Sequence, residues 1–128
     1  MTLSLSNILV VGAGSCFGGM TRYIVSRLIQ TSASGSFPWG TFAVNIIGCL
    51  IIGIIYGLLD RGFQLSEGMK LFLTVGFCGG FTTFSTFMHE NYLLFECGTP
   101  VIFSIYAIAS FSVGLAAVYL GYHLASMT

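Results

Sequence analysis

The chain has 128 residues, of which 55% are hydrophobic and only 6% are charged, and its mean hydropathy is +0.94. Soluble domains carry about 25% charged residues, so this composition excludes a soluble globular domain and indicates an integral membrane protein. The formal net charge is zero, which argues against nucleic acid as a partner. We expect one all-α domain over residues 1–128, embedded in the lipid bilayer.

Four apolar stretches are each long enough to cross a bilayer, which takes about 20 residues per helix. We expect transmembrane helices over Leu5–Ile29, Trp39–Leu59, Met69–Phe95 and Val101–Leu124. The connections are short, and there is no room for a fifth span. The first stretch lacks the basic start of a signal peptide, so we expect it to be a retained helix.

The first span combines small residues with one arginine. Gly14, Gly18 and Gly19 form a small-residue face, which is typical of close packing between membrane helices. Arg22 lies one turn beyond Gly18 on that face. An arginine near a helix end can extend to the lipid headgroups or serve a functional site, and its position leaves both roles open.

The second span is apolar except for Thr41 and Asn45. A buried amide needs hydrogen-bond partners. Asn45 therefore has two interpretations, as a link between helices or as a donor that points into a pore.

The third span has an unusual centre. Three glycines lie within Gly76–Gly80, and each lowers helix stability by about 1 kcal/mol relative to alanine. The sequence therefore predicts a glycine-rich break in this helix. Four hydroxyl side chains follow, at Thr82, Thr83, Ser85 and Thr86. Backbone groups that a break frees inside a membrane must be paired or line a cavity, so we interpret the stretch as the lining of a pathway. The glycines alone would indicate close packing.

An aromatic stripe continues from this stretch towards a carboxylate. Phe77, Phe81, Phe84 and Phe87 recur at helical spacing, and Glu90 shares their face. Glu90 is either a solvated carboxylate at a helix end or the mouth of a polar pathway. In the fourth span Tyr106, Ser110 and Gly114 lie on one face, where polar groups can bond neighbouring helices or form a track.

The basic residues give no orientation signal. Arg61 and Lys70 belong to one side of the membrane, and Arg22 and Arg27 to the other. The bias that usually orients a membrane protein is therefore 2 − 2 = 0. A chain that inserts both ways can form an antiparallel dimer with itself.

These features resemble the Fluc-type fluoride channels, also called the CrcB family. The resemblance covers the whole chain and is carried by three motifs, Gly18–Tyr23, Gly40–Gly48 and Gly79–Phe87. The third motif, Gly-Gly-Phe-Thr-Thr-Phe-Ser-Thr-Phe, is the most specific.

The resemblance implies a passive fluoride channel of the bacterial inner (plasma) membrane, with two pathways in an antiparallel, dual-topology homodimer. It assigns to each pathway Asn45, Phe84, Phe87, Ser85, Thr86, Glu90, Tyr106 and Ser110, and it assigns Arg22 to a vestibule. It also implies a structural sodium ion (Na+) at the dimer interface, held by the backbone carbonyls of Gly79 and Thr82. The last track position is a hydroxyl in some members and is Gly114 here.

The alternative is a proton-coupled small multidrug exporter, which also has four helices. Such a protein needs a carboxylate buried at mid-membrane. The first span has none, and Glu90 lies towards the end of the third. A purely structural subunit would leave Asn45 and the aromatic stripe without a shared purpose. No nucleophile–base pair or set of metal ligands is apparent, so we expect no enzyme activity. The four cysteines have no metal-binding spacing.

Overall fold

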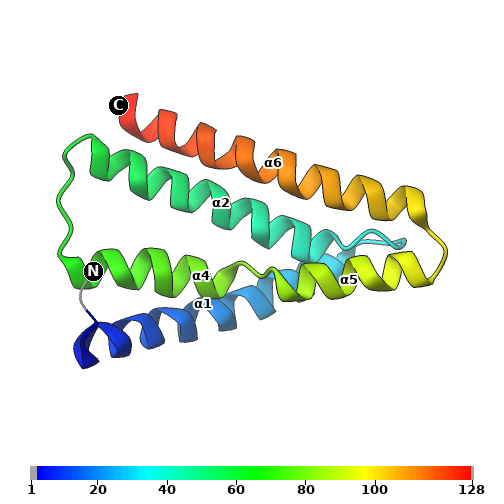
Figure 1. Cartoon of the computed structure of the whole chain (residues 1–128), viewed down its shortest axis with the longest axis horizontal. Coiled ribbons are helices and arrows are strands. Elements are labelled where there is room, and N and C mark those ends of the chain that lie inside the picture. Colours follow the sequence, from blue (N-terminus) through cyan, green and yellow to red (C-terminus); the bar gives the residue numbers. More distant parts are fainter. Residues whose placement is uncertain (1–2, 128) are drawn as a thin grey trace.

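The computed structural model describes residues 3–127, and this part of the chain is helical, with no strand (Figure 1). Four stretches are long and apolar enough to cross a membrane: α1 (Leu5–Ser32), α2 (Trp39–Asp60), a composite third span (Glu67–Glu96) and α6 (Pro100–Met127). The prediction of four helices that are long and apolar enough to span a membrane is confirmed. The third span begins at Glu67, two residues before the predicted start at Met69, and the Ser66 hydroxyl accepts the N–H of Met69 at 3.1 Å and caps the first turn.

The third span is built from four helical pieces and one non-helical stretch. It begins as α3 (Glu67–Leu71), widens into the π-helical segment η1 (Phe72–Cys78), and continues as α4 (Gly79–Phe81). Residues 82–84 are not helical, and Thr82 is fully extended, with φ −91° and ψ 161°. The helix resumes as α5 (Ser85–Glu96). The thin ribbon between α4 and α5 in Figure 1 marks the interruption.

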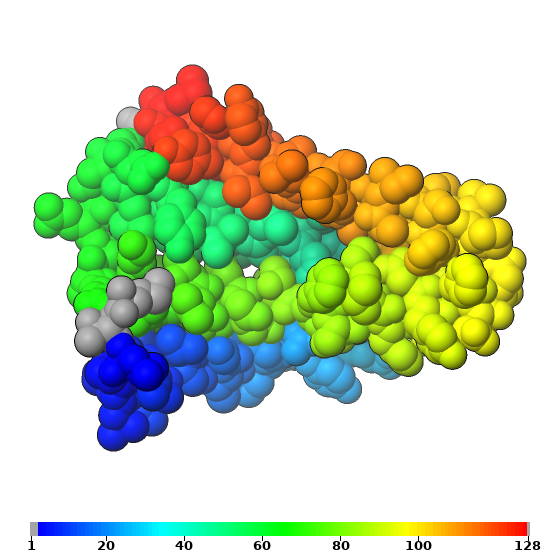
Figure 2. Space-filling model, viewed as in Figure 1, coloured from blue at the N-terminus to red at the C-terminus, as the bar shows by residue number. Residues whose placement is uncertain are grey.

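The spans pack as two pairs. α2 lies along α6, while α1 lies along η1 and α4, and α5 reaches α6 near the turn that joins them (Figure 1). In the space-filling view α2 lies between α6 and the third span, and a narrow opening separates α2 from the third span (Figure 2). The interruption at residues 82–84 faces α2, which belongs to the other pair of spans.

Two glycines of the third span, Gly76 and Gly80, serve the contact with α1. A Cβ on Gly76 would lie 2.9 Å from the Cα of Gly14, and one on Gly80 would lie 2.8 Å from the carbonyl oxygen of Ser15. Only glycine allows the two backbones to approach this closely. The backbone stays helical through Gly76, Gly79 and Gly80, so the interruption lies after the predicted stretch, at residues 82–84.

The outer faces of the described helices are apolar. Large side chains such as Leu9 and Phe17 on α1, and Phe111 and Leu115 on α6, are exposed. In water such a surface would aggregate, whereas in a bilayer it contacts lipid or another subunit. Trp39 is half-exposed at the start of α2, a position typical of an interfacial anchor.

Candidate functional site

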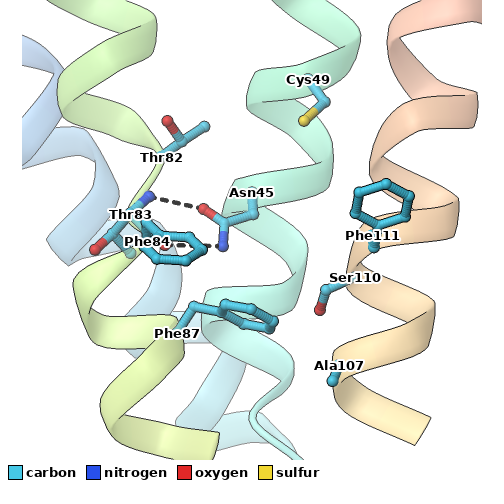
Figure 3. A pocket seen from close by; sticks show the side chains of 9 residues that line it. All are labelled: Asn45, Cys49, Thr82, Thr83, Phe84, Phe87, Ala107, Ser110 and Phe111. Atoms are coloured by element: carbon cyan, nitrogen blue, oxygen red, sulfur yellow. Dashed lines mark hydrogen bonds between the residues drawn. The ribbon is translucent and has the colours of Figure 1, made fainter.

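Asn45 pairs with the main chain of the interruption. The N–H of Thr83 donates to Asn45 Oδ1 at 2.8 Å, and Asn45 Nδ2 donates to the carbonyl oxygen of Thr83 at 3.1 Å (Figure 3). One amide thus satisfies both backbone groups of a residue that has left the helix. Of the two roles left open by the sequence, the structure gives Asn45 the link between helices. It uses only one of its two N–H groups for this link.

Two backbone carbonyls of the third span lack the N–H donors that they would have in a continuous α-helix. In a continuous α-helix, N–H groups donate to carbonyls four residues earlier. The N–H of Thr83 would then reach Gly79, but it donates to Asn45. The N–H of Thr86 would reach Thr82, but it donates to Thr83 Oγ1 at 3.2 Å. The carbonyls of Gly79 and Thr82 are therefore deprived of their helical partners by two side chains.

Arg22 fastens α1 to the turn before the interruption. Its Nε donates to the carbonyl oxygen of Gly80 at 2.9 Å. Ser15, two turns earlier on α1, donates its hydroxyl to Gly76 at 3.3 Å. Arg22 is therefore held at the backbone of the third span. The hydrogen bond from Arg22 occupies the carbonyl of Gly80, the residue between Gly79 and Phe81.

A cavity of about 430 Å³, here called the inner cavity, lies between α2, the interruption and α6 (Figure 3). It is lined by Asn45, Cys49, Thr82, Thr83, Phe84, Phe87, Ala107, Ser110 and Phe111, none of which is charged. Ser110 Oγ is buried and has no hydrogen-bond partner within residues 3–127. The cavity therefore offers polar hydrogens inside an apolar wall.

Glu90 joins three helices. Its carboxylate accepts the hydroxyl of Thr41 at 2.8 Å and the hydroxyl of Tyr106 at 2.7 Å. Tyr106 is fully buried, and its ring meets that of Phe87 edge to face, with centroids 4.9 Å apart. A continuous set of contacts thus runs from the inner cavity through Phe87 and Tyr106 to Glu90. Thr41 was not among the predicted site residues, although it lies one helical turn before Asn45 and so shares its face.

Other predicted residues lie outside this set. Ser85 is exposed, and neither Ser85 nor Thr86 lines the inner cavity. Gly114 is buried, and a Cβ there would lie 3.5 Å from the sulfur of Cys49. The thiol of Cys49 therefore lies beside Gly114, the position that carries a hydroxyl in some members of the family the sequence resembles. Cys49 lines the inner cavity. The sequence did not indicate this position, because the residues around Cys49 are apolar.

Known proteins similar to this chain agree on one family. The family described as "CrcB-like protein, Camphor Resistance (CrcB)" matches residues 9–122. The "Fluoride-specific ion channel FluC" of Bacteroides fragilis is 45% identical over 123 residues, which cover 94% of this chain and 96% of that protein. The protein of the same name from Chlorobaculum tepidum is 43% identical over 123 residues, 96% of this chain and 97% of that protein. The protein of the same name from Azobacteroides pseudotrichonymphae is 42% identical over 120 residues, which cover 94% of this chain and 96% of that protein. These relatives are named as ion channels and not as enzymes, and the chain belongs to the CrcB family.

Proposed function

We propose that this chain is a fluoride-selective channel through which fluoride leaves a bacterial cell passively across the inner membrane. The names of its relatives support this reading. The observation that carries it is the inner cavity, where Asn45 and Ser110 lie between aromatic rings and no charged side chain is present among the lining residues.

The donors of the cavity suit a small anion. Fluoride holds its water tightly, so a pore must replace that water with hydrogen-bond donors. Asn45 has one N–H beyond the one given to Thr83, and the hydroxyl of Ser110 has no partner within the described chain. Aromatic rings have positive edges, and Phe84 and Phe87 can present theirs to an anion. Larger halides gain less from such compact donors.

The remaining track residues extend this pathway. We assign Tyr106 and Glu90 to it because they are joined to Phe87 by direct contacts. Ser85 and Thr86 follow from the family resemblance alone. Arg22 places a fixed positive charge near the interruption, and a positive charge raises the local concentration of an anion. We therefore keep Arg22 as a vestibule residue.

The protein that conducts is proposed to be an antiparallel homodimer with two pathways. Phe84 lines the inner cavity yet is 73% exposed in the single chain. A second copy would cover this ring and complete the wall of the cavity. The balanced basic residues, two on each side of the membrane, support insertion in both orientations.

A sodium ion at the dimer interface fits the carbonyls of the interruption. The oxygens of Gly79 and Thr82 have lost their helical donors, and inside a membrane such groups require another partner. Within residues 3–127 no group of three or more His, Cys, Asp or Glu side chains could hold a metal ion. Carbonyl oxygens alone suit a hard cation, and the absence of Asp and Glu between Met69 and His89 favours a monovalent one. The bound cation would supply positive charge that attracts fluoride.

Liposomes loaded with both fluoride and chloride test the proposal. Vesicles containing the purified protein should release fluoride within seconds to minutes and retain chloride, while protein-free vesicles retain both. Ion-selective electrodes measure the two releases in one sample. Comparable rates for the two ions, or no fluoride release, would contradict the assignment. Proton-driven efflux of an organic cation would instead support the multidrug exporter.

A further inference from the structure

A second cavity, here called the outer cavity, lies where the loop before α2 meets the turn between α5 and α6. Its volume is about 340 Å³. The polar groups along its wall belong to Gln30, Ser36, Glu90, Cys97 and Thr99. The inner and outer cavities have no lining residue in common among those described. Glu90 is the polar link between them, since it lines the outer cavity and bonds to the tyrosine that packs on Phe87.

Polar groups lie between the two cavities. They are the Glu90 carboxylate and its two hydroxyl donors, Thr41 and Tyr106. Behind Tyr106 lies the Phe87 ring, which already faces the inner cavity. The Glu90 carboxylate, its two hydroxyl donors and the Phe87 ring thus lie between the outer cavity and the donors of Asn45 and Ser110.

The outer cavity has fixed walls and an open rim. Gln30 accepts the N–H of Gly40 at 3.0 Å, and Thr99 donates to the carbonyl of Leu94 at 2.8 Å, so both are tied to the main chain. Ser36 and Cys97 are exposed. Water can therefore reach the Glu90 end of the pathway from the loops at this surface.

We propose that the outer cavity is the mouth of the conduction pathway on this face, and that Ser36 and Cys97 form its rim. The pathway runs from the inner cavity past Phe87 and Tyr106 to Glu90 and leaves between the loop and the turn. This inference rests on the proposed function, because it names where the same fluoride ions meet water. It predicts that fixed charge on the rim changes the passage of fluoride according to its sign.

Cys97 allows a direct test by chemical modification. Cys16, the other exposed cysteine, is replaced by alanine, and Cys97 is labelled in detergent before reconstitution. Sulfonatoethyl methanethiosulfonate forms a mixed disulfide with the thiol, releases methanesulfinate and adds one negative charge. Fluoride release should fall by about tenfold, since one charge ~10 Å from the passing anion at an effective dielectric of ~20 has roughly that effect. The aminoethyl reagent, of similar size and opposite charge, should not lower it.

Mass spectrometry establishes that the thiol is fully modified, and a Cys97→Ser protein treated in the same way serves as the control. Equal fluoride release before and after complete modification, or equal slowing by both reagents, would contradict the proposal that the outer cavity is the mouth of the pathway. Either result would leave the proposed function intact. A thiol that neither reagent reaches would also contradict the proposed mouth. Absence of fluoride release from the unmodified native chain would overturn the proposed function and the mouth with it. Ser36→Asp and Ser36→Lys in the native chain provide the same comparison of charge without labelling.

Discussion

The α2–α6 pair and the third span use polar and small residues in opposite ways. In the α2–α6 pair the helices are continuous, and glycines bring the backbones together. A Cβ on Gly53 would collide with the carbonyl oxygen of Val118, and one on Gly121 would collide with that of Leu50. In the third span the backbone leaves the helix at residues 82–84, and Asn45 supplies the missing hydrogen bonds. One region keeps its helical hydrogen bonds, and in the other the main chain of Thr83 bonds to the side chain of Asn45 instead.

The difference shows what opens the helix. Gly76 and Gly80 lie in helical backbone and pack on α1, just as Gly53 packs on α6. The helix is interrupted where side chains compete for its hydrogen bonds, with Asn45 taking the N–H of Thr83 and Thr83 taking the N–H of Thr86. Glycines permit close approach in both regions, whereas the amide and the hydroxyl take the N–H groups that the carbonyls of Gly79 and Thr82 would bond in a continuous helix.

The largest effect should follow from Asn45→Asp. The change removes the N–H groups of the amide and places a negative charge opposite the permeating anion. At ~4 Å and an effective dielectric of ~20 the repulsion is about 4 kcal/mol, or roughly a 1,000-fold loss of fluoride release. Fluoride efflux from liposomes measures it, and size-exclusion chromatography shows whether the protein still assembles. Asn7→Asp, the same change near the start of α1, should leave efflux unchanged. Full activity of Asn45→Asp would remove Asn45 from the pathway.

A smaller effect is expected from Phe84→Ile and Phe87→Ile. Isoleucine keeps the wall apolar but has no ring edge, and ring contacts are worth about 0.5–1.5 kcal/mol beyond the area they bury. Each variant should lower fluoride release by up to about tenfold. Phe87→Ile should have the larger effect, because its ring also packs on Tyr106. Phe103→Ile, whose ring packs only on Phe95 among the described rings, is the control. Rates that match the native protein in both pathway variants would contradict the role of the rings.

The smallest effect on transport is expected in the α2–α6 pair. Gly53→Ala forces a Cβ against the backbone of Val118, and such overpacking typically costs about 1–3 kcal/mol of stability. Thermal unfolding in detergent should begin at a lower temperature, while the ratio of fluoride to chloride release stays the same. A change in selectivity without a loss of stability would show that α2–α6 packing shapes the pathway directly.

The sequence was sufficient for the four apolar spans and for the need of the Asn45 amide for hydrogen-bond partners. Apolar length alone predicted four helices, because a bilayer demands about 20 such residues for each. Asn45 could be singled out because an amide in an apolar span needs partners. Its partner could not be predicted, since Thr83 is 38 residues away and offers its main chain.

The position of the interruption could not be predicted either, because it also depends on contacts between segments that lie far apart in the sequence. Helix propensity pointed to Gly76–Gly80, where glycine destabilises a helix, but Gly76 and Gly80 are used for packing against α1. Thr41 was missed because a threonine in a membrane helix usually satisfies itself locally. Its bond to Glu90 depends on how α2 and α5 are placed. The two cavities likewise arise from the arrangement of helices, which periodicity does not encode.

The most direct test is a crystal structure of the protein grown with sodium and fluoride. The central claim is that side-chain pairing at residues 82–84 frees the carbonyls of Gly79 and Thr82 and builds the inner cavity. The account predicts two antiparallel chains, with compact density on the two-fold axis within about 2.6 Å of these carbonyls, the upper limit for oxygen ligands of calcium. It also predicts an anion beside Asn45 and Ser110. A parallel dimer, or carbonyls of Gly79 and Thr82 that accept ordinary helical hydrogen bonds, would contradict the claim.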